Sequence, residues 1–265
     1  MIRFNDDIFL QLNMAGLPVV FLHAFPVHSS MWKGQVDFLK DRGISSICLD
    51  YPGFGRSTVQ KKEFSMADIA GQVAGMLQAL QVRKAVFAGL SMGGYVALSL
   101  YARNPELFAG LLLASTRASD DNPETRERRT QLIGKLKKTM DLQEAIQFHL
   151  EKFFTKEFKE SHPEEIEQTE NWMQEATIAG VIQAQTAMAG RPDSSGLLEK
   201  MNFPVIVVAG EQDELTRAKD SQMMAQKLPN GEYFAIPHAA HLCNVEQPER
   251  FNEALWRLLA KVKQS

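Results

Sequence analysis

Short, uninterrupted apolar runs alternate with stretches of helical periodicity over much of this 265-residue chain. The runs occupy residues 19–22, 47–49, 85–88, 110–114, 204–209 and, more weakly, 232–236. A strand that is apolar at every position is buried on both faces, which is typical of parallel sheets. Ser65 opens the clearest helical pattern, and Asp68 follows at the spacing of a capping box. The alternation predicts an α/β fold with helices on both faces of a mostly parallel sheet.

The stretch between residues 119 and 200 has a different character. It is rich in charged residues, contains no strand-like run, and predicts helices over residues 123–139, 141–156 and 163–189. We therefore expect one core domain built from residues 1–118 and 201–265, with residues 119–200 inserted as a helical cap. Ligands of open α/β sheets bind outside the carboxyl ends of the strands, which places the expected site beneath this cap.

The sharpest motif is Gly-Leu-Ser-Met-Gly-Gly at residues 89–94. It follows an apolar run and precedes a helical pattern, which is the strand–turn–helix context of a nucleophile elbow. Glycine on either side of the serine would allow the strand and the helix to approach closely. The helix N-terminus beneath the serine would favour developing negative charge. Ser91 is therefore the candidate nucleophile.

A serine hydroxyl needs a base, and the elbow predicts the chain order serine, acid, histidine. His241 fits this order, because it lies in a loop between the last predicted strand and the C-terminal helix. His238 lies in the same loop and is the competitor.

An acid should follow the preceding strand and orient the histidine, stabilising the imidazolium that forms during the reaction. Asp213 is the choice within Gly-Glu-Gln-Asp-Glu at residues 210–214, where Glu211 and Glu214 are its neighbours. Asp120 or Asp121, after the run at 110–114, is the alternative.

The oxyanion of the tetrahedral intermediate needs backbone donors. In this kind of fold they are the amide after the nucleophile, here Met92, and an amide from a loop after an early strand. Phe25, in Leu-His-Ala-Phe-Pro at residues 22–26, is in place to supply the second one. Ala24 stands where glycine is expected in this loop.

With these residues identified, the chain resembles the α/β-hydrolase superfamily over nearly its whole length. The resemblance rests on His-Ala-Phe-Pro at 23–26, Asp-Tyr-Pro-Gly-Phe-Gly-Arg-Ser at 50–57, the elbow, the acid loop and the end of the chain. Within the superfamily it is most similar to small capped carboxylesterases and 3-oxoadipate enol-lactonases. The resemblance implies Ser91, Asp213 and His241 as the catalytic triad, and it implies no cofactor.

We therefore expect a serine hydrolase that cleaves a carboxylic ester of small or medium size through an acyl-serine intermediate. An enol-lactone hydrolase, a perhydrolase and a non-catalytic ligand receptor are the alternatives. Trp172 of the cap is a candidate for the pocket wall. A carboxylate-bearing lactone would need an inward-facing cation among Arg126, Arg128 and Arg129, although their spacing is more typical of a solvated helix face.

Charge and hydropathy argue against two kinds of binding partner, nucleic acid and a membrane. The net charge of −3 argues against nucleic acid, which usually binds a basic face. The longest apolar stretches fall far short of a membrane span, and the first ten residues lack a signal-peptide pattern. The two cysteines, Cys48 and Cys243, fit no metal-ligand spacing and are expected to be reduced thiols. We expect a cytoplasmic monomer or homodimer without a metal, acting on a small ester or lactone.

Overall fold

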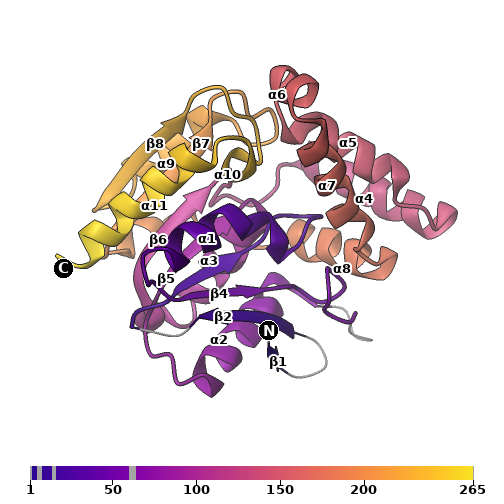
Figure 1. The fold of residues 1–265 in the computed structure, drawn as a ribbon. Coiled ribbons are helices and arrows are strands. Elements are labelled where there is room, and N and C mark those ends of the chain that lie inside the picture. The colour runs from indigo at the N-terminus through magenta and orange to yellow at the C-terminus, as the bar shows by residue number, and fades with distance from the viewer. Residues whose placement is uncertain (1, 5–7, 14–15, 60–63, 265) are drawn as a thin grey trace.

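A computed structural model describes residues 2–4, 8–13, 16–59 and 64–264 of the chain. An eight-stranded sheet forms its centre, in the order β1-β2-β4-β3-β5-β6-β7-β8 (Figure 1). The strands are β1 (Ile2–Phe4), β2 (Ile8–Asn13), β3 (Val19–Leu22), β4 (Ser46–Leu49), β5 (Ala85–Leu90), β6 (Phe108–Ala114), β7 (Val205–Gly210) and β8 (Gly231–Ile236). The six strands from β4 to β8 in this order pair in parallel, which confirms the predicted fold class.

The parallel strands are those that the apolar runs predicted. Every residue of β3, β4, β5 and β7 is buried, because helices cover both faces of the sheet at these strands. The strands β1 and β2 were not predicted; they add an antiparallel edge, with β2 pairing against β4.

Alternate residues of the parallel strands enter two separate apolar clusters. Val20 and Leu22 of β3 pack into one cluster with α2 (Met66–Ala79), α3 (Met92–Tyr101) and α9 (Ala218–Gln226). Val19 and Phe21 pack into the other, with α1 (Lys33–Lys40), α10 (Cys243–Glu246) and α11 (Pro248–Val262). The capping box predicted at the start of α2 is present, since Ser65 and Asp68 bond each other's backbone amides.

Five helices are inserted between β6 and β7 and lie together at the upper right of Figure 1. They are α4 (Pro123–Thr139), α5 (Gln143–Phe153), α6 (Lys156–Ser161), α7 (Pro163–Gln174) and α8 (Ile178–Ala189). The insertion contacts the core closely at α8. A Cβ on Gly53 would lie 2.5 Å from the Gly180 Cα, and the Thr177 amide donates to the Gly53 carbonyl at 2.8 Å. Glycine at both positions permits this approach.

A buried network joins the two ends of the insertion. The Asp121 carboxylate, before α4, accepts from Arg129 Nε at 2.6 Å and from Arg191 Nη1, after α8, at 2.7 Å. The Arg191 guanidinium also lies 3.9 Å from the centre of the Tyr95 ring on α3. Cap helix α4, the return to the core and the helix after the elbow are therefore held at one point.

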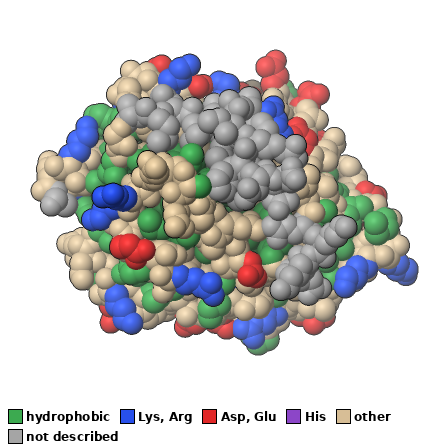
Figure 2. All heavy atoms as spheres, turned by 90° about the horizontal axis from the view of Figure 1, so that it is seen from below, with side chains coloured by type: hydrophobic (Ala, Val, Ile, Leu, Met, Phe, Trp, Pro, Cys, Tyr) green, Lys and Arg blue, Asp and Glu red, His purple; other side chains and the backbone are tan. Residues whose placement is uncertain are grey.

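On the face seen from below, the coloured hydrophobic side chains are scattered between charged ones (Figure 2). Within the described part of the chain, no helix combines the length and the apolar character needed to cross a bilayer.

Candidate active site

Ser91 lies at the turn between β5 and α3, in the strained backbone geometry of an elbow. Its φ of 54° and ψ of −112° are unusual for a residue with a side chain. Hydrogen bonds on both sides hold it there. The Ser91 amide donates to the Ala114 carbonyl at 2.9 Å, and Thr116 Oγ1 donates to the Ser91 carbonyl at 2.8 Å. The neighbouring strand β6 thus fixes the serine at the carboxyl end of the sheet.

Close approaches explain the glycines of the motif. A Cβ at Gly93 would lie 2.0 Å from the Leu22 carbonyl oxygen of β3, and one at Gly89 would lie 2.5 Å from the Gly93 carbonyl oxygen. Both distances are far inside van der Waals contact, so a side chain at either position would displace the backbone that carries Ser91. The local pattern therefore has a steric cause in the tertiary structure.

Asp213 and His241 meet above the sheet. His241 Nδ1 lies 2.9 Å from Asp213 Oδ2, and both side chains are buried. Asp213 Oδ1 accepts from the amides of Leu215 and Thr216 at 2.8 and 2.9 Å. The carboxylate is thus oriented by two backbone donors, and it holds the imidazole with Nδ1 as the protonated nitrogen, leaving Nε2 as the basic one. The Phe153 ring of α5 stacks on the imidazole at 5.6 Å.

The competing acids have other partners. Asp120 pairs with Arg126, and Asp121 pairs with Arg129 and Arg191. Glu214 pairs with Lys152. Among the residues that the structure describes, Asp213 is the carboxylate within hydrogen-bond distance of the His241 ring.

His238, the competing histidine, has φ of 53° in the turn after β8. Its carbonyl accepts from Gln247 Nε2 at 3.3 Å, and its side chain does not line the cavity at Ser91. In the structure, His238 is therefore a residue of this turn and lies outside the cavity lining.

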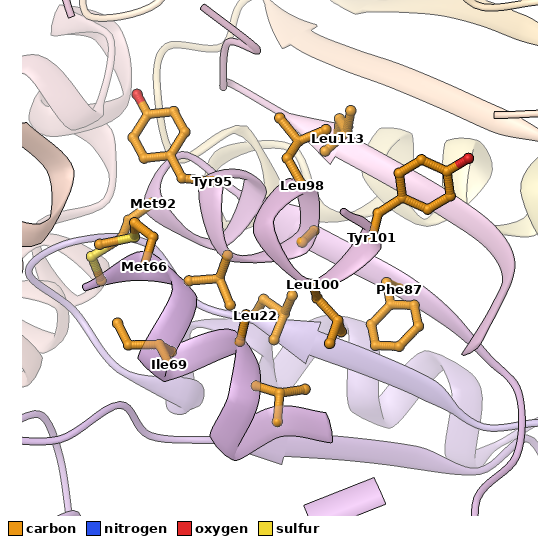
Figure 3. Close-up of a cluster of buried hydrophobic side chains, with 14 of the residues drawn as sticks. Leu22, Met66, Ile69, Phe87, Met92, Tyr95, Leu98, Leu100, Tyr101 and Leu113 are labelled. Carbon is orange, nitrogen blue, oxygen red and sulfur yellow. The ribbon is translucent and has the colours of Figure 1, made fainter. Parts of the chain in front are cut away.

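The two expected oxyanion donors lie on segments that meet at the elbow. The Met92 side chain lies in the apolar cluster beside Met66 (Figure 3), and its backbone begins α3 directly after Ser91. Phe25 lines the cavity beside Ser91. Its loop is held by His23, whose Nδ1 bonds the Ala24 carbonyl at 2.8 Å and whose Nε2 accepts from the Tyr51 amide at 3.0 Å.

The His23 imidazole is uncharged and holds the loop through its two hydrogen bonds. Complete burial lowers its pKa to about 4, so that it stays uncharged at neutral pH. The Asp50 carboxylate also holds neighbouring backbone in place. It accepts from the amide of Ser29 at 2.8 Å and from the amide of Arg56 at 3.1 Å. These residues shape the loops around the site and do not reach the cavity.

A cavity of about 530 Å³ opens over Ser91 and His241. Its walls come from the elbow, from the acid loop and from helices α4, α5 and α8. The lining residues are Phe25, Ser91, Tyr95, Arg117, Thr125, Arg128, Arg129, Gln131, Leu132, Lys135, Glu144, Ala145, Phe148, His149, Phe153, Gln185, Met188, Glu214, Leu215, Thr216 and His241. The volume suits a small or medium-sized ligand.

Trp172 is not among the lining residues, so the expectation for the pocket wall is wrong. Its ring packs edge-on against His28 at 6.2 Å, because the face of α7 that carries it turns toward the core rather than toward Ser91. The three arginines of α4 lie in two environments. Arg126 and Arg128 are largely exposed and pair with Asp120 and Glu124, as expected of a solvated face, although Arg128 also borders the cavity. Arg129 is mostly buried in the cavity wall, where it pairs with Asp121.

Arg117 and His149 are among the lining residues that sequence reasoning missed. Arg117 follows β6 and enters the wall beside the acid loop. His149 of α5 donates from Nδ1 to the Ala145 carbonyl at 2.6 Å, and burial lowers its pKa to about 4. It is therefore a neutral imidazole in the cavity wall. Nothing in the local sequence marks either side chain as facing inward: Arg117 lies in the loop after β6, and His149 lies in a charge-rich helix of the insertion.

The cysteines lie outside the cavity. Both are free, and burial raises the pKa of both thiols, that of Cys243 to about 12. Across the described ranges, no group of three or more His, Cys, Asp and Glu residues is arranged to hold a metal ion.

Comparison with known proteins agrees with the fold described above. A sequence model described as the alpha/beta hydrolase family matches residues 19–254. The chain is 28% identical over 237 residues to 3-oxoadipate enol-lactonase 2 of Acinetobacter baylyi, which covers 89% of this chain and 86% of the relative. Among solved structures, a thermophilic esterase from Thermogutta terrifontis, with malate bound, has a TM-score of 0.92 at 34% identity, covering 96% of this chain and 93% of that one. A hydrolase from Pseudomonas aeruginosa has a TM-score of 0.88 at 26% identity, covering 95% and 94%.

Proposed function

Because this chain belongs to the alpha/beta hydrolase family, we propose that it is a serine hydrolase that cleaves carboxylic esters of small or medium-sized substrates. The observation that carries this proposal is that a strained Ser91 and His241 line the same cavity, and that His241 Nδ1 lies 2.9 Å from Asp213 Oδ2. A serine held on an elbow and a histidine with a free Nε2 are the two components that nucleophilic acyl transfer requires.

In the first half of the reaction, Ser91 Oγ attacks the ester carbonyl carbon while His241 Nε2 takes the hydroxyl proton. Negative charge moves to the carbonyl oxygen, where the amides of Phe25 and Met92 are the proposed donors. The tetrahedral intermediate collapses, the carbon–oxygen bond to the alcohol breaks, and His241 returns the proton to the leaving alkoxide. An acyl-serine remains.

In the second half, His241 Nε2 takes a proton from a water molecule, whose oxygen attacks the acyl carbon. The same amides receive the negative charge. Collapse breaks the bond to Ser91 Oγ and releases the carboxylic acid, and His241 returns the proton to the serine. Asp213 stays ionised throughout and stabilises the imidazolium in each half.

A series of p-nitrophenyl esters from acetate to octanoate, assayed with the wild type and with Ser91→Ala, tests this proposal. We expect turnover by the wild type, with an optimum at the chain length that fits the 530 Å³ cavity, and none above background with the variant. A serine-directed fluorophosphonate should add one mass label to the wild type only. Full activity of Ser91→Ala would refute the mechanism.

A second candidate is hydrolysis of an enol-lactone, which needs the same steps on a ring ester. It is favoured by the 28% identity to 3-oxoadipate enol-lactonase 2 over most of both chains. Perhydrolysis would use the same residues with hydrogen peroxide in place of water. Assays on a lactone, and of peroxide-dependent bromination, distinguish these reactions from hydrolysis of open-chain esters.

A further inference from the structure

The cavity over Ser91 carries a surplus of positive charge. Its charged lining residues are Arg117, Arg128, Arg129 and Lys135 on one side and Glu144 and Glu214 on the other. Two of these cancel, because Lys135 Nζ is bonded to Glu144. Two further charges are compensated from outside the cavity, because Glu214 is bonded to Lys152 and the largely exposed Arg128 lies 3.9 Å from Glu124. The surplus therefore comes from Arg117 and Arg129.

The buried network behind the wall does not remove the surplus. Arg129 and Arg191 share the single carboxylate of Asp121, so this trio carries one net positive charge. Arg129 Nη1 also donates to Gln185 Oε1 at 2.7 Å, which fixes its guanidinium in the wall. Because the trio is largely buried, solvent screens its field at the cavity less than it would at the surface.

Arg117 is the cavity cation that lies next in sequence to a residue bonded to Ser91. It directly follows Thr116, whose hydroxyl bonds the Ser91 carbonyl. Arg117 Nη2 donates to the Leu215 carbonyl at 2.7 Å, and Nε is buried with no hydrogen-bond partner in the described structure. None of the described carboxylates lies within ion-pair distance of it. A half-buried guanidinium held by one neutral acceptor lacks a counter-charge.

We propose that Arg117 binds a carboxylate carried by the substrate, and that the preferred substrates are esters or lactones with such a carboxylate. This inference rests on the proposed hydrolase function. A guanidinium offers a planar fork of donors that matches a carboxylate in charge and geometry. The net positive charge of the Arg129–Asp121–Arg191 trio also attracts the substrate carboxylate. The two carboxylates of the cavity wall, Glu144 and Glu214, are each paired with a lysine and so repel it less. Arg117 is thus a specificity-determining residue beside Ser91.

Two matched substrate pairs test the proposal. The carboxylate lies on the acyl side in mono-p-nitrophenyl adipate, compared with p-nitrophenyl heptanoate, and on the alcohol side in p-acetoxybenzoate, compared with phenyl acetate. The wild type is compared with Arg117→Gln, which removes the charge, and Arg117→Lys, which keeps it. Arg126→Gln is the control, because this cation also belongs to the region but is paired with Asp120 and does not line the cavity.

We expect Arg117→Gln to lower kcat/KM for the anionic ester of one pair by about ten- to a hundredfold relative to its neutral partner, the range of a charge-assisted hydrogen bond. Arg117→Lys should restore part of the ratio, and Arg126→Gln should leave it unchanged. The pair that responds shows on which side of the ester the carboxylate lies. An unchanged ratio in both pairs overturns the proposal. An equal loss on anionic and neutral esters also overturns it, because Arg117 would then act only through the Leu215 loop.

Failure of the hydrolase function has a different signature. If the wild type cleaves none of the four esters, titration calorimetry of adipate into Ser91→Ala and into the Ser91→Ala, Arg117→Gln double variant decides the subsite alone. Tighter binding of adipate to the single variant supports it. Equal binding, or no binding by either protein, overturns it.

Discussion

Replacing Asp213 by asparagine should leave the fold intact and remove most of the catalytic rate. The native carboxylate accepts three hydrogen bonds, two at Oδ1 from the amides of Leu215 and Thr216 and one at Oδ2 from His241 Nδ1. An asparagine of the same shape has one acceptor oxygen and one donor nitrogen. The two backbone amides will hold the oxygen, so the NH₂ group will face the imidazole.

An NH₂ group at that place selects the opposite tautomer of His241. Nδ1 must then present its lone pair, which moves the ring proton to Nε2 and removes the base that Ser91 needs. We expect kcat to fall by about 10⁴-fold, as a wrong tautomer costs in a triad of this kind. That corresponds to about 5.5 kcal/mol in the activation free energy. KM should change little, because Asp213 does not line the cavity.

Stopped assays with the best p-nitrophenyl ester measure this effect, with circular dichroism and the thermal midpoint as checks of folding. Asp120→Asn is the matched control, since that carboxylate is surface-exposed and paired with Arg126. A fall of less than tenfold in a folded Asp213→Asn protein would refute the assignment of this residue. An equal fall in Asp120→Asn would show that charge in the region, rather than the tautomer, sets the rate.

Three further predictions concern the scaffold. Gly93→Ala should prevent folding or lower the thermal midpoint strongly, because its Cβ would lie 2.0 Å from a carbonyl oxygen of β3; a midpoint within a few degrees of the wild type would contradict this. Burial raises the pKa of Asp121, but the bonds from Arg129 and Arg191 outweigh it and hold that pKa below its usual range. The resulting stability is present above the unfolded-state pKa of about 4 and is lost as pH falls through the folded value, so urea unfolding of Asp121→Asn should show a weaker loss on acidification. The two buried thiols, whose pKa values are raised by burial, should react with a disulfide reagent only after unfolding; rapid labelling of the native protein would disprove this.

Sequence alone determined the parallel strands and pointed to the candidate nucleophile. Both faces of strands such as β3 and β7 are covered, so every position is apolar. This produces a run of consecutive apolar residues that can be recognised in the sequence. The elbow is equally local, since the serine, its glycines and the flanking strand and helix lie within about 17 residues. Asp213 and His241 could be identified because the order of the elements places both loops at the same edge of the sheet.

Tertiary structure decided the shape and charge of the cavity. Trp172 and His149 lie on neighbouring insertion helices of similar composition, and only the packing of those helices turns one toward His28 and the other toward Ser91. Arg117 likewise becomes a cavity residue because β6 ends beside the acid loop. Residues in secondary structure follow local periodicity, whereas a binding wall is assembled from distant segments whose relative placement no local pattern records. For that reason the candidate triad could be predicted from the sequence, whereas the residues that would select a substrate could not.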